Sequence, residues 1–188
     1  MQFSELPLHK SILKAVAEER FHTPTKVQEK AIPLVLAKKN VIVSSQTGTG
    51  KTAAFALPII QLLLEKEVVD IKEKKKIKSL IVTPTRELAI QILENFKSYS
   101  KYTNLKTTAV FGGVSLEPQK EILTEGIDVL VATPGRLIDL QMQGNIDLSA
   151  IEIFVLDEAD LMLDMGFITD VKKIEALCPK KKQTLLFS

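Results

Sequence analysis

Short apolar runs alternate along the chain with longer segments in which apolar residues recur every three or four positions. The short runs are rich in Val, Ile and Leu, which is typical of strands buried on both faces of a parallel sheet. They lie at 40–44, 79–83, 109–111, 129–132, 153–156 and 184–187. Strands that alternate with helices predict an α/β fold, an open, mostly parallel sheet with helices on both faces and right-handed crossovers. Ligands of such sheets bind at the carboxyl ends of the strands.

The segments between the apolar runs carry apolar stripes with the period of an α-helix. Three stripes follow the first strand, through Phe55, Ile59, Leu62 and Leu63, through Leu88, Ile92, Phe96 and Tyr99, and through Phe167, Val171, Ile174 and Leu177. Two precede it, through Leu8, Ile12, Leu13 and Val16 and through Val27, Ala31, Leu34 and Val35, with the helix-breaking turn FHTPT between them. We therefore expect one domain over 1–188, with two helices in 1–36 and the strand-and-helix core in 37–188.

The composition fits one soluble globular domain and excludes several classes of protein. At 188 residues the chain is long enough for one well-packed core and too short for two ordinary domains. The single cysteine, Cys178, excludes an internal disulfide, and the two histidines beside it give no zinc-ligand spacing. No apolar run approaches the roughly 18 residues of a membrane span, and the chain begins without a signal-peptide core. We expect a monomeric, cytoplasmic protein with no membrane partner, and the net charge of +2 says little about other partners.

The segment VIVSSQTGTGKT has the pattern of a phosphate-binding loop, a strand ending in a Gly-rich turn that a helical segment follows at once. Glycines let the backbone amides face a phosphate chain, the lysine adds charge for the outer phosphates, and the last threonine offers a hydroxyl to Mg²⁺. The strict pattern has Gly where Ser45 stands, and the alternative is a Gly-rich turn with an incidental lysine. The expected nucleotide contacts are Ser45, Gln46, Thr47, Gly48, Thr49, Gly50, Lys51 and Thr52.

Four further residues, Asp157-Glu158-Ala159-Asp160, directly follow the predicted strand at 153–156. Burying carboxylates at a strand end without a cation is costly. Mg²⁺ bound by Thr52 would supply that cation, so Asp157 is the expected metal-side carboxylate, through water because Mg²⁺ dehydrates reluctantly. Glu158 then remains to orient and deprotonate the attacking water, which makes Glu158, Lys51 and Asp157 the candidate catalytic residues. An acidic pair at a strand end can instead cap the next helix.

Together these segments resemble the DEAD-box RNA helicase family. The acidic tetrad spells the family's name, SQTGTGKT resembles its first motif, and FHTPTKVQ, with Phe21, Gln28 and an upstream Phe3, resembles its adenine-reading motif. Two residues depart from that motif, because Arg20 stands where the family usually has Gly and Lys26 where Pro is common. The resemblance covers essentially the whole chain. It implies a RecA-like P-loop fold, the cofactors ATP and Mg²⁺, and RNA-dependent ATP hydrolysis.

The side chains of Gln28 and Phe21 also have the chemistry needed to bind adenine. The Gln28 carboxamide has a donor and an acceptor that match N7 and the exocyclic amine of adenine together, a pattern that guanine does not present. The Phe21 ring can stack on the base. By itself, a Gln near a helix start is usually exposed to solvent.

Three segments that follow predicted strands look like the family's RNA-contacting loops. Their residues are Pro84, Thr85, Arg86, Gly112, Gly113, Thr133, Pro134, Gly135 and Arg136. Charged forks, hydroxyls and glycines suit a sugar-phosphate chain and do not read bases, so RNA would be bound through its backbone, independently of sequence. By themselves such segments are ordinary strand-to-helix turns.

The last residue, Ser188, matches the first residue of the family's Ser-Ala-Thr motif. By resemblance, Ser188 and Asp160 couple the tetrad to a second RecA-like domain. We expect that domain, with arginines worth about 10³- to 10⁵-fold in rate, to lie outside this chain. The chain alone should therefore bind ATP or ADP weakly to moderately and hydrolyse ATP very slowly.

Two other functions remain open at this point. A RecA-like ATPase that acts on DNA would share the phosphate loop and the metal carboxylate, although the adenine-reading segment and the tetrad favour RNA. An ATP-gated RNA clamp or assembly scaffold would share every motif. The charge-dense segment 65–78 is expected to be a solvated helix end and loop, with its lysines as a lesser candidate for an RNA contact.

Overall fold

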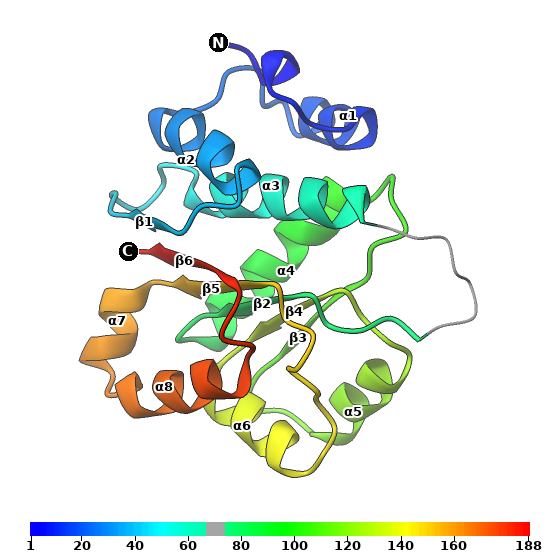
Figure 1. Cartoon of the computed structure of the whole chain (residues 1–188), viewed down its shortest axis with the longest axis vertical. Coiled ribbons are helices and arrows are strands. Elements are labelled where there is room, and N and C mark those ends of the chain that lie inside the picture. The colour runs from blue at the N-terminus through cyan, green and yellow to red at the C-terminus, as the bar shows by residue number, and fades with distance from the viewer. Residues whose placement is uncertain (67–73) are drawn as a thin grey trace.

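A single parallel sheet organises the chain (Figure 1). The computed structural model describes residues 1–66 and 74–188. Within them, six strands have the order β1-β6-β5-β2-β4-β3, and every neighbouring pair is parallel. The strands are β1 (Val41–Val43), β2 (Ser79–Val82), β3 (Thr107–Val110), β4 (Val129–Ala132), β5 (Ile153–Asp157) and β6 (Gln183–Phe187). Each overlaps a predicted apolar run, which confirms the expected sheet. Residues 67–73 of the charge-dense segment lie outside the described residues.

Helices cover both faces of the sheet, as predicted. They are α1 (Lys10–Glu18), α2 (Lys26–Leu36), α3 (Lys51–Glu65), α4 (Arg86–Ser100), α5 (Glu117–Thr124), α6 (Pro134–Met142), α7 (Ala159–Asp164) and α8 (Ile168–Leu177), with a short 3₁₀ turn, η1 (Phe3–Glu5), before them. Side chains alternate between the faces, so Ile81 of β2 belongs to the core cluster that α1 to α4 share, whereas Leu80 and Val82 belong to the cluster that α5 to α8 share.

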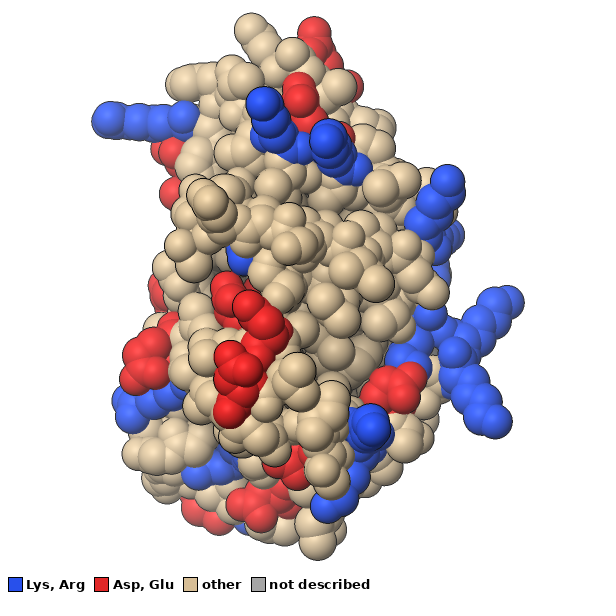
Figure 2. Space-filling view, turned by 90° about the vertical axis from the view of Figure 1, so that its left-hand side faces the viewer, with Lys and Arg blue, Asp and Glu red and all other residues tan. Residues whose placement is uncertain are grey.

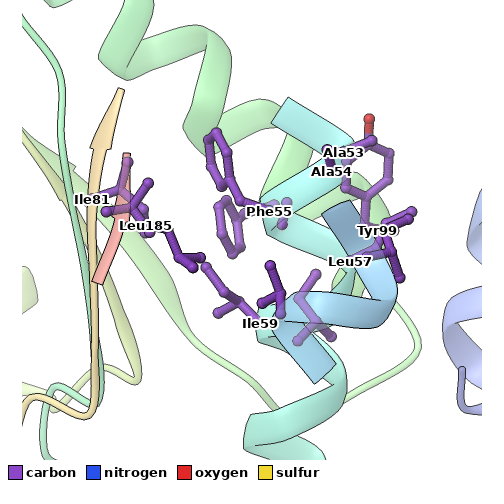
Figure 3. Packing of buried hydrophobic residues seen from close by; sticks show 14 of the residues in the cluster. Ala53, Ala54, Phe55, Leu57, Ile59, Ile81, Tyr99 and Leu185 are labelled. Atoms are coloured by element: carbon purple, nitrogen blue, oxygen red, sulfur yellow. The ribbon is translucent and has the colours of Figure 1, made fainter. Parts of the chain in front are cut away.

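Helix α3 lies between the sheet and the two N-terminal helices (Figure 1). Its residues are therefore buried on almost every side. The Phe55 ring meets the Phe187 ring of β6 edge-on at a centroid distance of 5.0 Å, and Figure 3 shows Phe55 and Ile59 facing Ile81 and Leu185 of the sheet. This packing fixes the helix, and with it the position of the loop that leads into its first turn.

Two residues of the predicted apolar stripes do not face the core. Leu34 and Leu177 are each 40% exposed. The buried stripe of α2 runs through Gln28, Ala31, Ile32 and Val35, and Leu34 lies about 100° around the helix from Val35. The structure also adds α5, α6 and α7, whose six to nine residues are too short to show a clear helical period.

Arg20 ends the first helix in the left-handed conformation, with φ of 61°. The Arg20 amide donates to the Ala17 carbonyl, and the Phe21 amide donates to the Val16 carbonyl. These two bonds form a Schellman motif, whose left-handed position favours Gly because a Cβ strains it. Arg20 therefore destabilises the folded state relative to the Gly that the family usually has at this position.

Replacing Arg20 by Gly should therefore raise the free energy of unfolding by about 1 kcal/mol. Urea unfolding followed by circular dichroism measures the change. Arg20→Ala is the matched control, because it removes the long side chain and keeps the Cβ, and it should give no gain. An equal gain from both variants would assign the effect to the side chain and not to the backbone.

Candidate active site

Predicted site residues follow all six strands of the described sheet. They begin after β1, β2, β3, β4, β5 and β6, at Ser45, Pro84, Gly112, Thr133, Glu158 and Ser188. Because parallel strands end at the same edge, these segments meet there, and Figure 1 shows the loop after β1, the C-terminus and α7 together on its left-hand side. Figure 2 faces this edge and shows Asp and Glu side chains gathered near the middle of the view, at the height of α7.

The phosphate loop folds back on itself through hydrogen bonds. Gly48 and Gly50 have φ of 79° and 81°, the left-handed region that the predicted turn requires. The Thr49 hydroxyl donates to the Gln46 carbonyl at 2.7 Å and lies 2.9 Å from the Ser45 hydroxyl. Ser45 therefore has a structural partner at the position where the strict pattern has Gly.

Gln28 joins the second helix to the phosphate loop. Its side chain is only 4% exposed. Its Oε1 accepts from the Thr25 amide at 2.9 Å, and its Nε2 donates to the Gly50 carbonyl at 3.2 Å. A Cβ on residue 50 would come within 2.3 Å of that Nε2, so any other residue there would displace the Gln28 carboxamide. These two bonds orient the carboxamide and leave it one N–H and one lone pair, the set needed for adenine.

Thr25 also joins the second helix to the phosphate loop, and the prediction from the sequence did not include this residue. Its hydroxyl accepts from the Gln28 amide at 3.3 Å, which completes a capping box, and donates to the Thr49 carbonyl at 2.8 Å. The pattern Thr-x-x-Gln before a helical stripe was the available signal. Phe21, the other base-contacting candidate, is 38% exposed, with its ring centroid 6.3 Å from those of Phe3 and Tyr99. The Phe21 ring therefore packs near two other aromatic rings and keeps part of its surface exposed, where a base could stack.

Lys51 connects the phosphate loop with the acidic tetrad. Its Nζ donates to the Ser45 carbonyl at 2.8 Å and lies 3.8 Å from Oε1 of Glu158. Asp157 is buried beside them, and its Oδ2 accepts from the Thr83 hydroxyl at 3.3 Å. Thr83, which is fully buried, is a second residue that sequence reasoning missed, because no local pattern marks it. The predicted catalytic residues thus lie together.

The electrostatics of this group favour a cation. Burial, and then the charge of Glu158, raises the pKa of Asp157 to about 6, although Thr83 and Lys51 act in the opposite direction. The described residues contain no group of three or more His, Cys, Asp or Glu side chains that could hold a metal ion by themselves. One buried carboxylate and the Thr52 hydroxyl at the start of α3 fit Mg²⁺, which typically keeps several waters and takes its other ligands from phosphates.

Glu158 and Asp160 differ in backbone and environment. Glu158 has φ of 53°, a strained conformation that turns the chain from β5 into α7. Asp160 is exposed, and a hydrogen bond with the Ser188 side chain holds its pKa below the usual value. The Ser188 amide donates to Val43 and its carbonyl accepts from the Ser45 amide, so Asp160 and the phosphate loop share one neighbour. Their coupling to another domain stays a prediction.

The segments expected to contact RNA gather beside the same edge. Thr85 caps α4, since its hydroxyl accepts from the Leu88 amide at 3.3 Å. The Arg86 guanidinium lies over the Phe111 ring, with its Cζ 5.4 Å from the centroid. Gly113 has φ of 79°, and a Cβ there would lie 3.8 Å from Nη1 of Arg86. The first and second of the three predicted segments are therefore in contact.

The third segment is joined to the second by Arg136, whose Nη2 donates to the Val114 carbonyl at 3.0 Å. The expectation that all of these residues lie in loops is wrong for Arg86 and for Pro134-Gly135-Arg136. They form the first turns of α4 and α6, where Pro at the first position of α6 is preorganised for a helix.

A surface hollow lies at the edge of the sheet opposite the predicted site residues. A hollow of about 360 Å³ opens near Ile153 and Gln183, the first residues of β5 and β6, and none of the predicted site residues lines it. In the described part of the chain, no helix is long and apolar enough to cross a membrane.

Asp157 should make stability depend on pH. The unfolded chain has the ordinary value of 3.8, and the folded protein has a pKa of about 6, so the folded state binds the extra proton between them. The free energy of unfolding therefore falls as the pH rises through this window. Asp157→Asn should abolish that fall and gain about 1 to 3 kcal/mol at pH 7.5, measured by urea unfolding without Mg²⁺ or nucleotide. Asp164→Asn, in exposed α7, should keep the wild-type pH profile, and a wild-type profile in Asp157→Asn would contradict the assignment.

Solved structures share this fold over the whole chain. A crystal structure of a DEAD box protein from the hyperthermophile Methanococcus jannaschii matches 100% of this chain and 50% of its own, with a TM-score of 0.89 at 43% identity. The structure of a hypothetical ATP-dependent RNA helicase from Sulfolobus tokodaii matches 96% of this chain and 50% of its own, with a TM-score of 0.86 at 44% identity. The open α/β fold with a RecA-like helicase architecture is confirmed.

Relatives identified by sequence are also named ATP-dependent RNA helicases. The DEAD-box ATP-dependent RNA helicase RhpA of Helicobacter pylori (strain B128) is 46% identical over 186 residues, which are 99% of this chain and 36% of that protein. A probable ATP-dependent RNA helicase of Methanocaldococcus jannaschii is 43% identical over 189 residues, 100% of this chain and 49% of its own length. This chain thus spans a third to a half of these relatives. A family model described as DEAD/DEAH box helicase matches residues 25–188, and the chain belongs to that family.

Proposed function

We propose that the complete protein is an RNA-stimulated ATPase and ATP-dependent RNA helicase. In it, this chain is the amino-terminal RecA-like domain, which binds ATP with Mg²⁺ and the RNA backbone and supplies the hydrolytic residues. The observation that carries the proposal is the contact of Lys51 with Glu158 at 3.8 Å, because it brings the phosphate loop and the acidic tetrad into one site. Similar proteins are named ATP-dependent RNA helicases. The cytoplasmic location and the monomeric state stay predictions from the sequence.

Each residue of this site has a distinct task toward ATP. Gln28, oriented by Thr25 and Gly50, uses its remaining N–H and lone pair to select adenine. The Lys51 ammonium exchanges the Ser45 carbonyl for the outer phosphates, where its charge stabilises the transition state. Glu158 orients the attacking water and accepts its proton.

Thr52 and Asp157 are the residues that would hold Mg²⁺. The ion supplies positive charge that offsets the charge developing on the phosphates. Burial of Asp157 next to Glu158 makes its carboxylate costly without such a cation, which supports this choice. Thr83 holds the carboxylate in place from the neighbouring strand.

RNA would cross the part of the edge formed by the ends of β2, β3 and β4. Arg86 and Arg136 bring positive charge there, and Gly113 allows close approach of a phosphate to the backbone. Because β2 lies between β4 and β5 in the sheet, the RNA segments adjoin the catalytic carboxylates. Both substrates would therefore be bound along one edge.

A second RecA-like domain would supply the other wall of the site. The matched relatives are two to three times as long as this chain, since it covers 36% and 49% of them. Arginines from that domain would raise the rate by about 10³- to 10⁵-fold, so the chain alone is expected to hydrolyse ATP very slowly.

In the complete protein, Glu158→Gln should lower RNA-stimulated ATP hydrolysis by about 10²-fold or more and leave ATP affinity within a few-fold, because the base is lost and the phosphate contacts remain. A coupled phosphate-release assay and titration with a fluorescent ATP analogue measure the two quantities. Asp164→Asn is the matched control, since it removes an exposed carboxylate of α7 and should change neither quantity. Wild-type turnover in Glu158→Gln would remove Glu158 from this role.

The same assay separates RNA from DNA as the activator. Wild-type protein should be stimulated by a single-stranded RNA and not by the DNA of the same sequence, because only RNA adopts A-form geometry readily and carries the 2′-hydroxyl. Equal stimulation by both would favour a DNA-directed ATPase. Absence of any stimulation would contradict the proposed function.

A further inference from the structure

Gln119 is a buried polar residue that none of the recognised motifs includes. It is 8% exposed and, with Leu123, is one of the two buried residues of α5. Its Nε2 donates to the Phe111 carbonyl at 3.1 Å, and its Oε1 accepts from Nη1 of Arg136 at 3.0 Å. Buried amides are usually bonded, but these two partners belong to two different segments of the proposed RNA surface.

Three hydrogen bonds, Gln119 to Phe111, Arg136 to Gln119 and Arg136 to Val114, close a ring around the two glycines. Gln119 holds the Phe111 carbonyl just before Gly112, and Arg136 holds the Val114 carbonyl just after Gly113. A Cβ on Gly112 would meet no atom within 4 Å, and a Cβ on Gly113 would lie 3.8 Å from Nη1 of Arg86, so neither glycine is tightly enclosed by other groups. The hydrogen bonds at the two ends therefore restrain the Gly112-Gly113 backbone.

The charge of Arg136 is not neutralised by these contacts. A guanidinium has five N–H donors, and the two described bonds use two of them on neutral oxygen acceptors. Among the described residues, no carboxylate lies within ion-pair distance of Arg136, whereas seven other pairs do form. A neutral amide thus fixes the orientation of the arginine and leaves its positive charge for an anion. A carboxylate at position 119 would fix it equally well and cancel the charge.

We propose that Gln119 is a positioning residue for RNA, which aims Arg136 at a backbone phosphate and holds the Gly112-Gly113 backbone in its binding conformation. The inference depends on the proposed RNA-binding function and goes beyond it by assigning a residue of α5. A purely structural role, as an anchor of α5, would change stability alone. The two roles differ in the salt dependence of RNA binding.

The test uses the complete protein and a fluorescent 15-nucleotide poly(U) RNA, with a nonhydrolysable ATP analogue present. Gln119→Met keeps the length and volume of the side chain and deletes both hydrogen bonds, and Gln119→Glu keeps an acceptor for Arg136 and adds a charge. Fluorescence anisotropy over a range of salt concentrations gives the RNA Kd and its salt slope. Glu121→Ala, on the exposed side of α5, is the control.

We expect Gln119→Met to weaken RNA binding about tenfold at low salt and Gln119→Glu to weaken it at least as much, with a salt slope smaller by about one charge. ATP affinity without RNA should match wild type, and the RNA concentration for half-maximal ATPase should rise more than kcat falls. Wild-type RNA affinity in either variant overturns the inference, and so does weaker binding of ATP and RNA alike, which indicates general disruption. If wild-type protein binds no RNA, the proposed function itself fails.

Discussion

The parallel direction of the strands is the constraint on which the rest of this structure depends. Neighbouring parallel strands need a crossover, so helices cover both faces and each strand ends at the same edge. Five strand ends therefore place a phosphate loop, an acidic tetrad and three Gly- or Thr-containing turns side by side. Residues separated by more than a hundred positions, such as Lys51 and Glu158, come within 3.8 Å without any local pattern between them.

Polar groups at this edge are linked to one another and not left isolated. Gln28 bonds to Thr25 and to Gly50, so the N-terminal helices and the phosphate loop share one hydrogen-bonded unit. Asp157 accepts hydrogen bonds from the Thr83 hydroxyl and the Glu158 backbone, and its raised pKa marks the part of the edge where these contacts do not fully compensate a buried charge. A site that binds a cation and a polyanion has this character, because its ligands supply the missing partners.

Periodicity predicted all six strands and the long helices, because continuous apolar runs and long stripes record burial directly. It missed α5 to α7, and it included Leu34 and Leu177, which are exposed, since an apolar residue at the margin of a stripe can face solvent. Motifs predicted the chemical residues, including Gln28 and Glu158. Thr83 and Gln119 were missed because burial and pairing of a lone polar residue arise from tertiary contacts. Thr25 had a local signal, the capping box.

The central claim is that this edge reads adenine and holds phosphates through one connected set of residues. Calorimetric titration of residues 1–188 with ATP and with GTP, each with Mg²⁺, tests it most directly. We predict a measurable Kd for ATP and binding of GTP at least about tenfold weaker, because the free N–H and lone pair of Gln28 match adenine alone. Equal affinity for the two nucleotides, or no binding of either, would contradict the account.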